Sequence, residues 1–428
     1  MAIAKYLSLI GIIFLYLFNF TISPLKITGT GLVLACCFAA LIFDRRVIKF
    51  ISKLLATNSI LITLLLSAGA VGTCLSAWGG AGEFIFLEIF IKNIIVLFAA
   101  SILAFYIKQY NFNNYKNDFS LDVYLILDLC FYALSLQAFF VLISFINPDI
   151  RGFFSSITIN KGNIDIDHPF RFRGLHDSGG FTLSAFLGIG FIYSMFSFLR
   201  NNDQHMLKKV ALTFISIIIL ISIALVGRTG FVVIGIGFFL LAIRWPVNTG
   251  RMTLYGISIG IIILIMARLI FLEKFDYFNS TVFNYAFELF LNAKDGQGFR
   301  TDSSDDLKSM LFIPNFLNVV FGSGSFDTYY AGVPRSDSGY LKTLLASGVF
   351  GFIAIYGSYF FIASKILCTK KISPDLIYFL FIIIVIIISI EIKGPVFYQN
   401  DISRFIWLIY GSLMANQFVS TDKIQHNI

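Results

Sequence analysis

Long apolar runs alternate with short polar segments along almost the whole chain. A helix needs roughly 20 apolar residues to cross a bilayer core of about 30 Å, and most of these runs reach or approach that length. The pattern predicts an all-α polytopic membrane protein with about twelve transmembrane helices, in one integral membrane domain. The predicted spans are 6–22, 27–43, 58–77, 85–107, 121–146, 179–199, 210–226, 230–243, 252–271, 339–362, 375–392 and 404–418.

Lysines and arginines fall mainly in alternate connections between these spans. With a cytoplasmic N-terminus, the inward connections hold Arg45, Arg46, Lys49, Lys53, Lys108, Lys116, Arg200, Lys208, Lys209, Arg244, Arg251, Lys365, Lys370, Lys371 and Lys423. The short outward connections hold only Lys26, Arg228, Lys393 and Arg404. This asymmetry follows the positive-inside rule and predicts a bacterial inner-membrane protein with both termini in the cytoplasm.

The amino-acid composition indicates that most of the protein surface is in contact with lipid. Hydrophobic residues make up 57% of the 428 residues and charged residues 13%, whereas soluble domains have roughly 45–50% and about 25%. The topological loops account for much of the net charge of +8, so we expect no nucleic-acid partner. Four of the five cysteines lie in apolar runs and Cys368 lies at a helix end, which predicts neither a disulfide framework nor a zinc site.

Two polar segments, 147–178 and 272–338, are too long to be tight turns, and both are expected on the periplasmic side. Long loops in compact proteins are usually functional or disordered. The second is expected to contain short helices, because Phe283, Phe287 and Leu291 recur at helical spacing.

The hairpin over residues 210–243 carries Arg228 at its turn, in the sequence Gly227-Arg228-Thr229-Gly230. Two full crossings need roughly 40 residues, so this shorter hairpin should hold its turn below the membrane surface. A buried arginine beside a helix start, with Thr229 as the expected cap, would make an anion site. The alternative is an arginine that snorkels to the interface.

Further polar side chains precede the spans at 179 and 339. The first loop ends with Arg171, Arg173, His176 and Asp177, which form either a binding site or a solvated rim. The second loop ends with Arg335, Asp337 and Ser338, where Asp337 is a candidate general base and, in the alternative, Asp337 or Ser338 caps the following helix. Glu391, Lys393 and Arg404 lie at the outer ends of the last two spans. Glu88 and Lys92 should form an ion pair, and Asp128 has no obvious local partner.

The order of these motifs resembles the Wzy-type O-antigen polymerases. The shared features are an Arg-Thr-Gly hairpin, the Gly-Ser-Gly of residues 322–324, and Ser336-Asp337-Ser338-Gly339-Tyr340-Leu341 before a helix with Gly348 and Gly351. The related O-antigen ligases share the layout and typically have a histidine where this chain has Asp337, a departure that favours the polymerase.

The resemblance implies a GT-C-like, metal-independent glycosyltransferase without a cofactor, acting at the periplasmic face. Donor and acceptor would be glycans on undecaprenyl pyrophosphate, with a chain-length regulator as a further partner. The catalytic candidates are Asp337, His176 and Asp177. The candidates for binding pyrophosphate or glycan are Arg228, Arg173, Arg335, Arg171, Lys393 and Arg404.

Two alternatives remain open at this point. A ligase of the same fold would transfer glycan to lipid A-core instead of to another repeat unit. A lipid-linked oligosaccharide flippase would also have about a dozen spans, but it should place charges near the membrane midplane and has little need of a long outer loop.

Overall fold

The computed structural model of the protein describes most of the helical regions of the chain. It covers residues 2–18, 20–22, 27–78, 85–112, 119–158, 172–176, 180–200, 206–250, 292, 294, 308, 316–322, 336–369, 371–397 and 401–426. The predicted span 252–271 and most of the second long loop lie outside these residues.

The chain forms two compact units, each built from two separate stretches of sequence. Unit 1 comprises Met1–Leu32 and Leu127–Thr301, and unit 2 comprises Val33–Ile126 and Asp302–Ile428. Helices α2 (Gly29–Phe43) and α6 (Phe119–Ile146) each contribute residues to both units. The assignment of one integral membrane domain stays a prediction.

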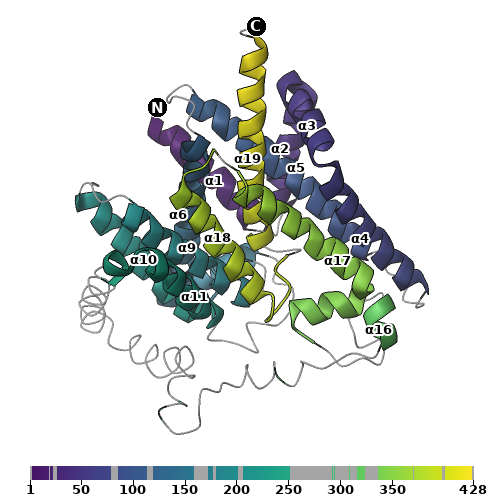
Figure 1. Ribbon diagram of the computed structural model, residues 1–428. Coiled ribbons are helices and arrows are strands. Elements are labelled where there is room, and N and C mark those ends of the chain that lie inside the picture. Colours follow the sequence, from purple (N-terminus) through teal and green to yellow (C-terminus); the bar gives the residue numbers. More distant parts are fainter. Residues whose placement is uncertain are drawn as a thin grey trace. The chain divides into compact units, whose positions relative to one another are not determined.

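Unit 1 is a helical bundle in which α9 is the central helix. Its other described elements are α1 (Ala2–Leu17), β1 (Thr21–Ile22), β2 (Ile27–Thr28), α7 (Pro148–Ile157), α10 (Met206–Val226) and α11 (Thr229–Arg244). Helix α9 (Gly180–Arg200) packs against both α10 and α11 (Figure 1). Almost every residue of α9 is buried, including Ser184, Gly188 and Ser194. Small side chains along α9 let the neighbouring backbones approach closely, as is common between membrane helices.

Unit 2 is built around the pair α5 and α19. Its described elements are α3 (Arg45–Thr57), α4 (Ser59–Trp78), α5 (Ile85–Phe112), α16 (Phe316–Phe321), α17 (Gly339–Leu367), α18 (Pro374–Ile390) and α19 (Asp401–His426). Helix α5 packs against both α19 and α4, and α4 packs against α17 (Figure 1). Trp407 and Tyr410 of α19 are completely buried in this core.

Every predicted span that lies within the described residues falls on a helix, which confirms an all-α membrane protein. The described residues also form one short strand pair. Five of the described helices are long and apolar enough to cross a membrane, or up to six if the bent pair α3–α4 forms one span. Helices α1, α2, α11 and α18 are apolar but shorter. Twelve crossings and a GT-C-like fold stay predictions.

Two predicted spans differ in detail from the observed helices. The first was expected to run to Ile22, but α1 ends at Leu17, and Thr21–Ile22 pairs with Ile27–Thr28 as a small antiparallel hairpin. Helix α17 is broken at Gly348, which has φ +63°. This left-handed conformation is readily adopted by glycine alone, and it allows α16 to pack at the break.

Residues 45–57, expected to be a cytoplasmic loop, form the amphipathic helix α3. The Asp44 side chain caps this helix by accepting a hydrogen bond from the Arg46 backbone N–H at 2.9 Å. Its buried side chains are Val47, Phe50, Ile51 and Leu54. Their i, i+3, i+4, i+7 spacing defines one apolar face, while the lysines and arginines occupy the opposite face.

Candidate functional site

The turn between α10 and α11 consists of Gly227 and Arg228. Gly227 and the neighbouring Thr229 are buried, whereas Arg228 is partly exposed. Thr229 was expected to cap α11, but this is wrong: Arg228 occupies the capping position in a helical conformation, and its side chain makes no capping hydrogen bond. The Arg228 side chain is therefore not committed to closing the helix end.

Ser184 of α9 fixes this turn from the side. Its hydroxyl donates to the carbonyl of Gly227 and accepts a hydrogen bond of 2.8 Å from the backbone N–H of Gly230. One serine thus satisfies a polar backbone group on each side of Arg228. In an apolar surrounding, leaving such groups unpaired would cost about 1–3 kcal/mol each.

Gly230 is required for the close contact between α11 and α9. A Cβ atom on Gly230 would lie 2.5 Å from the carbonyl oxygen of Ser184 and 2.6 Å from a methyl carbon of Ile223. The backbone oxygen cannot move without shifting α9. The glycine of the Arg-Thr-Gly sequence therefore has a packing role of its own.

We expect Gly230→Ala to destabilise unit 1 by roughly 1–3 kcal/mol, because it overpacks the α9–α11 contact. Gly235→Ala is the matched control, since a Cβ atom on Gly235 of the same helix meets nothing within 4 Å. Thermal unfolding of the purified proteins in detergent measures both. Equal midpoints for the two variants would contradict this packing role.

The segment 172–176 is held against the turn of α10 and α11 by a backbone hydrogen bond. The N–H of Phe172 donates to the carbonyl of Leu225, three residues before Arg228, at 3.1 Å. The Gln137 side chain of α6 donates to the carbonyl of Arg173 at 2.6 Å. Two arginine-bearing stretches far apart in sequence are thus brought together at one end of unit 1.

Arg173 and His176 are both buried within this segment, with exposures of 9% and 2%. The His176 ring packs edge-on against Phe18, with ring centroids 5.8 Å apart. Gly174 between them has φ +59°, and a Cβ atom there would lie 3.0 Å from the backbone nitrogen of Val141. These contacts exclude the alternative of a freely solvated rim for Arg173 and His176.

Arg151 is a third arginine at this end of unit 1, and it is not among the site residues predicted from the sequence. Its guanidinium carbon lies 4.7 Å from the centroid of the Phe172 ring, within range of a cation–π interaction. Arg151 belongs to α7, which had been expected to be part of a loop. The sequence does contain a signal for this helix, because Asn147 caps α7 and Pro148 occupies its first turn. This combination is typical of helix starts.

In unit 2, Asp337 is an exposed residue between two buried serines immediately before α17. Ser338 takes the capping position of that helix without a side-chain hydrogen bond. Of the two residues named for the capping alternative, Ser338 occupies the position and Asp337 does not. Its carboxylate lies at the start of a helix, where the backbone dipole favours negative charge.

The buried carboxylate of Glu391 is held by hydrogen bonds and lies against the start of α17. The carboxylate accepts hydrogen bonds from the Tyr356 hydroxyl at 2.8 Å and from the Val396 backbone N–H at 2.6 Å. Its own carbonyl accepts from the Gly339 N–H at 2.8 Å. Gly339 leaves room for this carboxylate, because a Cβ atom there would collide with it.

Glu391 lies in the turn after α18 and is completely buried. Burial raises its pKa to about 7, although the hydrogen bonds from Val396 and Tyr356 oppose the rise. A carboxyl group that exchanges its proton near neutral pH is a candidate acid or base. The sequence predicted that Glu391 lies at the outer end of its span, but it did not indicate that the side chain is buried.

The stability of the protein should fall as the pH rises from about 4.5, the ordinary pKa of glutamate, to about 7, the pKa in the folded state. In this window the folded protein holds a proton that the unfolded chain has released. Glu391→Gln should remove this decline, which thermal unfolding across the pH range measures. Glu88→Gln, an exposed position paired with Lys92, should keep it. If the stability of Glu391→Gln declined with pH as the wild type does, the decline could not be assigned to the carboxyl group of Glu391.

The remaining predicted site residues have different surroundings. Arg404 forms an ion pair of 3.1 Å with the buried Asp401 in the first turn of α19, which takes up part of the charge predicted to bind an anion. Lys393 is partly exposed in the turn after α18. Arg171, Asp177 and Arg335 lie outside the described residues. Within the described part of the chain, no three metal-binding side chains come together.

Three further charged residues in the predicted spans have partners in the structure. Glu88 and Lys92 form the expected ion pair along α5. Asp128, left unassigned, accepts a hydrogen bond of 2.6 Å from the Tyr193 hydroxyl of α9.

Comparisons with protein-family models, with curated proteins and with solved structures gave no match.

Proposed function

We propose that this protein is a membrane glycosyltransferase of the Wzy O-antigen polymerase type. It would join undecaprenyl-pyrophosphate-linked oligosaccharide repeat units into O-antigen or a related surface polysaccharide at the periplasmic face of the inner membrane. In each step the bond between the donor sugar and pyrophosphate breaks, and a glycosidic bond to an acceptor hydroxyl forms. The hydroxyl proton passes to a base, and lipid pyrophosphate leaves.

The single observation that carries the proposal is that arginine-bearing segments distant in sequence contact one another at one end of unit 1. The hydrogen bond between Phe172 and Leu225 ties the segment bearing Arg173 to the stretch that leads into Arg228, and Arg151 stacks on Phe172. A pyrophosphate leaving group needs fixed cations to stabilise its developing charge. Arginine suits this task because its planar fork donates two parallel hydrogen bonds to phosphate oxygens.

The proposed base is Asp337. Asp337 is exposed and does not occupy the capping position of α17, and a base for the acceptor hydroxyl must be reachable from outside the protein. Glu391 is too enclosed to meet a sugar directly, and its contact with Gly339 gives it the role of holding the backbone beside Asp337. His176 is the competing candidate for the base.

Deletion of the gene followed by electrophoresis of surface polysaccharide tests this function. A polymerase deletion should leave chains with a single repeat unit. Long polymer that is not attached to lipid A-core would instead identify a ligase, and loss of both products would identify a flippase. The purified protein should also polymerise purified lipid-linked repeat units without added metal, which neither alternative would do.

The proposed location requires both long loops to face the periplasm. Cysteines introduced at Asn163 and Asp305, in a background without native cysteines, should react with an impermeant thiol reagent added to intact cells. Cysteines at Asn113 and Asn202 should react only after the membrane is opened, because the positive-inside rule places them in the cytoplasm. The reverse labelling pattern would overturn the orientation.

A further inference from the structure

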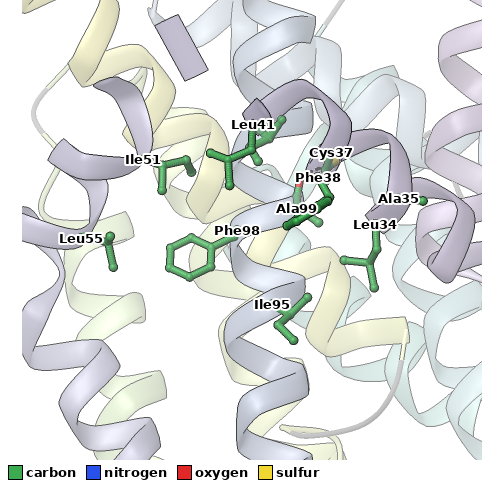
Figure 2. Close-up of a pocket in the computed structure, with 11 residues that line it drawn as sticks. Leu34, Ala35, Cys37, Phe38, Leu41, Ile51, Leu55, Ile95, Phe98 and Ala99 are labelled. Carbon is green, nitrogen blue, oxygen red and sulfur yellow. Dashed lines mark hydrogen bonds between the residues drawn. The ribbon is translucent and has the colours of Figure 1, made fainter. Parts of the chain in front are cut away.

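An apolar hollow in unit 2 lies between α2, α3 and α5. Its volume is about 530 Å³, within the range of roughly 300–1,000 Å³ typical of ligand pockets. Figure 2 shows Phe98 of α5 and Leu41 and Phe38 of α2 among the lining side chains, with Ile51 of α3 beside them. The lining residues are all apolar apart from the thiol of Cys37. Such a surface suits a hydrocarbon chain and cannot bind a polar substrate.

The hollow is open to its surroundings and is not a sealed cavity. Two of its lining side chains, Phe38 and Leu55, are 65% and 42% exposed. Next to it, Phe43 at the end of α2 is 86% exposed and Ile48 of α3 is 47% exposed. An exposed apolar surface that continues from a membrane helix onto an amphipathic helix is typical of a protein face in contact with lipid.

The same helix α3 carries positive charges beside the hollow. Ile51 and Leu55 line the hollow, and Ile48 shares their stripe because residues three and seven positions apart lie on one helical face. Arg45 and Lys49 lie four residues apart on the adjoining, exposed face. On the surface of α3, Ile48 therefore lies between the side chains that line the hollow and the two cations.

Arg45 and Lys49 are the cations available to a ligand. Arg46 is engaged by Asp44, with 2.9 Å between Nη2 and Oδ2, and the Lys53 amine lies over the Phe418 ring at 5.3 Å from its centroid. Among the described residues, Arg45 and Lys49 have no ion-pair partner. A phosphate would supply the missing negative charge.

We infer that this hollow and the Arg45–Lys49 pair together bind an anionic phospholipid. One acyl chain would occupy the hollow, and the phosphate of the headgroup would lie against the two cations. The positive-inside rule places this site in the cytoplasmic leaflet, where anionic headgroups attract basic amphipathic helices. The inference does not depend on the glycosyltransferase activity, because the site uses none of the residues proposed for that reaction.

Native mass spectrometry of the purified protein tests the site with two probe lipids, phosphatidylglycerol and phosphatidylcholine. The wild type should bind phosphatidylglycerol more tightly. Arg45→Gln combined with Lys49→Gln should weaken that binding about thirty-fold, because each cation near an anionic headgroup contributes about 1 kcal/mol. Binding of phosphatidylcholine should not change.

A second pair of variants tests the hollow. Ala35 lines it, so Ala35→Phe should fill it and weaken the binding of phosphatidylglycerol. Ala39 is an exposed residue of the same helix that does not line the hollow, and Ala39→Phe should bind as the wild type does. Gel filtration and thermal unfolding establish that all variants are folded.

Three results would overturn the inference. The first is equal affinity of the wild type for the two lipids. The second is unchanged phosphatidylglycerol binding in the double variant. The third is full displacement of the lipid by glycerol phosphate at matched concentration, which would identify a site for the free phosphate group and not for a lipid.

Discussion

Arg228→Ala should abolish polymer formation while leaving the protein folded at its normal level. Removal of one fixed hydrogen-bond donor that stabilises a negative charge in the transition state typically lowers the rate by about 10²–10³-fold. Because the same step is repeated for every repeat unit added, the effect on chain length is larger still. The side chain makes no capping hydrogen bond, so its loss should not unwind α11. Under the proposed function, the measurement is the rate at which the purified protein polymerises lipid-linked repeat units.

Arg228→Lys separates the charge of this residue from its shape. Lysine keeps the positive charge but loses the planar fork that donates two parallel hydrogen bonds. We expect an intermediate rate, well below the wild type and above Arg228→Ala. A lysine variant as active as the wild type would mean that only the charge matters.

Arg244→Ala is the matched control for these variants. Arg244 is an exposed arginine at the opposite end of the same helix, beside the Trp245 ring. Its removal changes the net charge and the helix composition in the same way, yet it should leave polymerisation unchanged. Full-length polymer from Arg228→Ala, or an equal loss from Arg244→Ala, would remove Arg228 from the donor site.

The apolar helices could be predicted from sequence because a bilayer imposes a minimum length on each span. Helix α3 was missed for the same physical reason, since its polar face breaks any long apolar run. Its apolar side chains recur at helical spacing, so a search for amphipathic periodicity would have found it. The break at Gly348 was not predictable, because glycine is also common in unbroken membrane helices.

The candidate site was predictable in its residue types but not in its contacts. The Arg-Thr-Gly sequence indicated Arg228, whereas the hydrogen bond between Phe172 and Leu225 depends on packing between distant parts of the chain. Likewise, Glu391 carries no local signature of burial. Its enclosure comes from Tyr356, Val396 and the start of α17, which only the folded arrangement brings together.

Asp337→Asn should stop polymerisation because the amide cannot accept the proton of the acceptor hydroxyl. General base catalysis typically contributes about 10²–10⁴-fold, so we expect a loss of at least about a hundredfold in the purified system. Asparagine has nearly the same size and is itself a good residue at helix starts. Asp337 is exposed, so the substitution should not alter the amount of folded protein.

Three further variants distinguish a base from a residue with a structural role. Asp375 is an acidic residue in the first turn of α18, so Asp375→Asn removes a helix-start carboxylate elsewhere and should leave polymerisation intact. Glu391→Gln keeps an acceptor and a donor for Val396 and Tyr356, and we expect a modest loss through misplacement of Asp337. His176→Ala should lower stability, because the ring is buried against Phe18.

The dependence of rate on pH decides between the remaining assignments. If Asp337 is the base, Asp337→Asn should lower the rate across the whole pH range, whereas Glu391→Gln should keep the acidic limb of the wild-type pH–rate profile at a lower overall rate. If Asp337→Asn polymerises normally while folded His176→Ala does not, the base is His176 and Asp337 has no catalytic role. If only Glu391→Gln loses the acidic limb, the buried carboxyl group itself carries the proton, and the exposed aspartate serves to bind the acceptor.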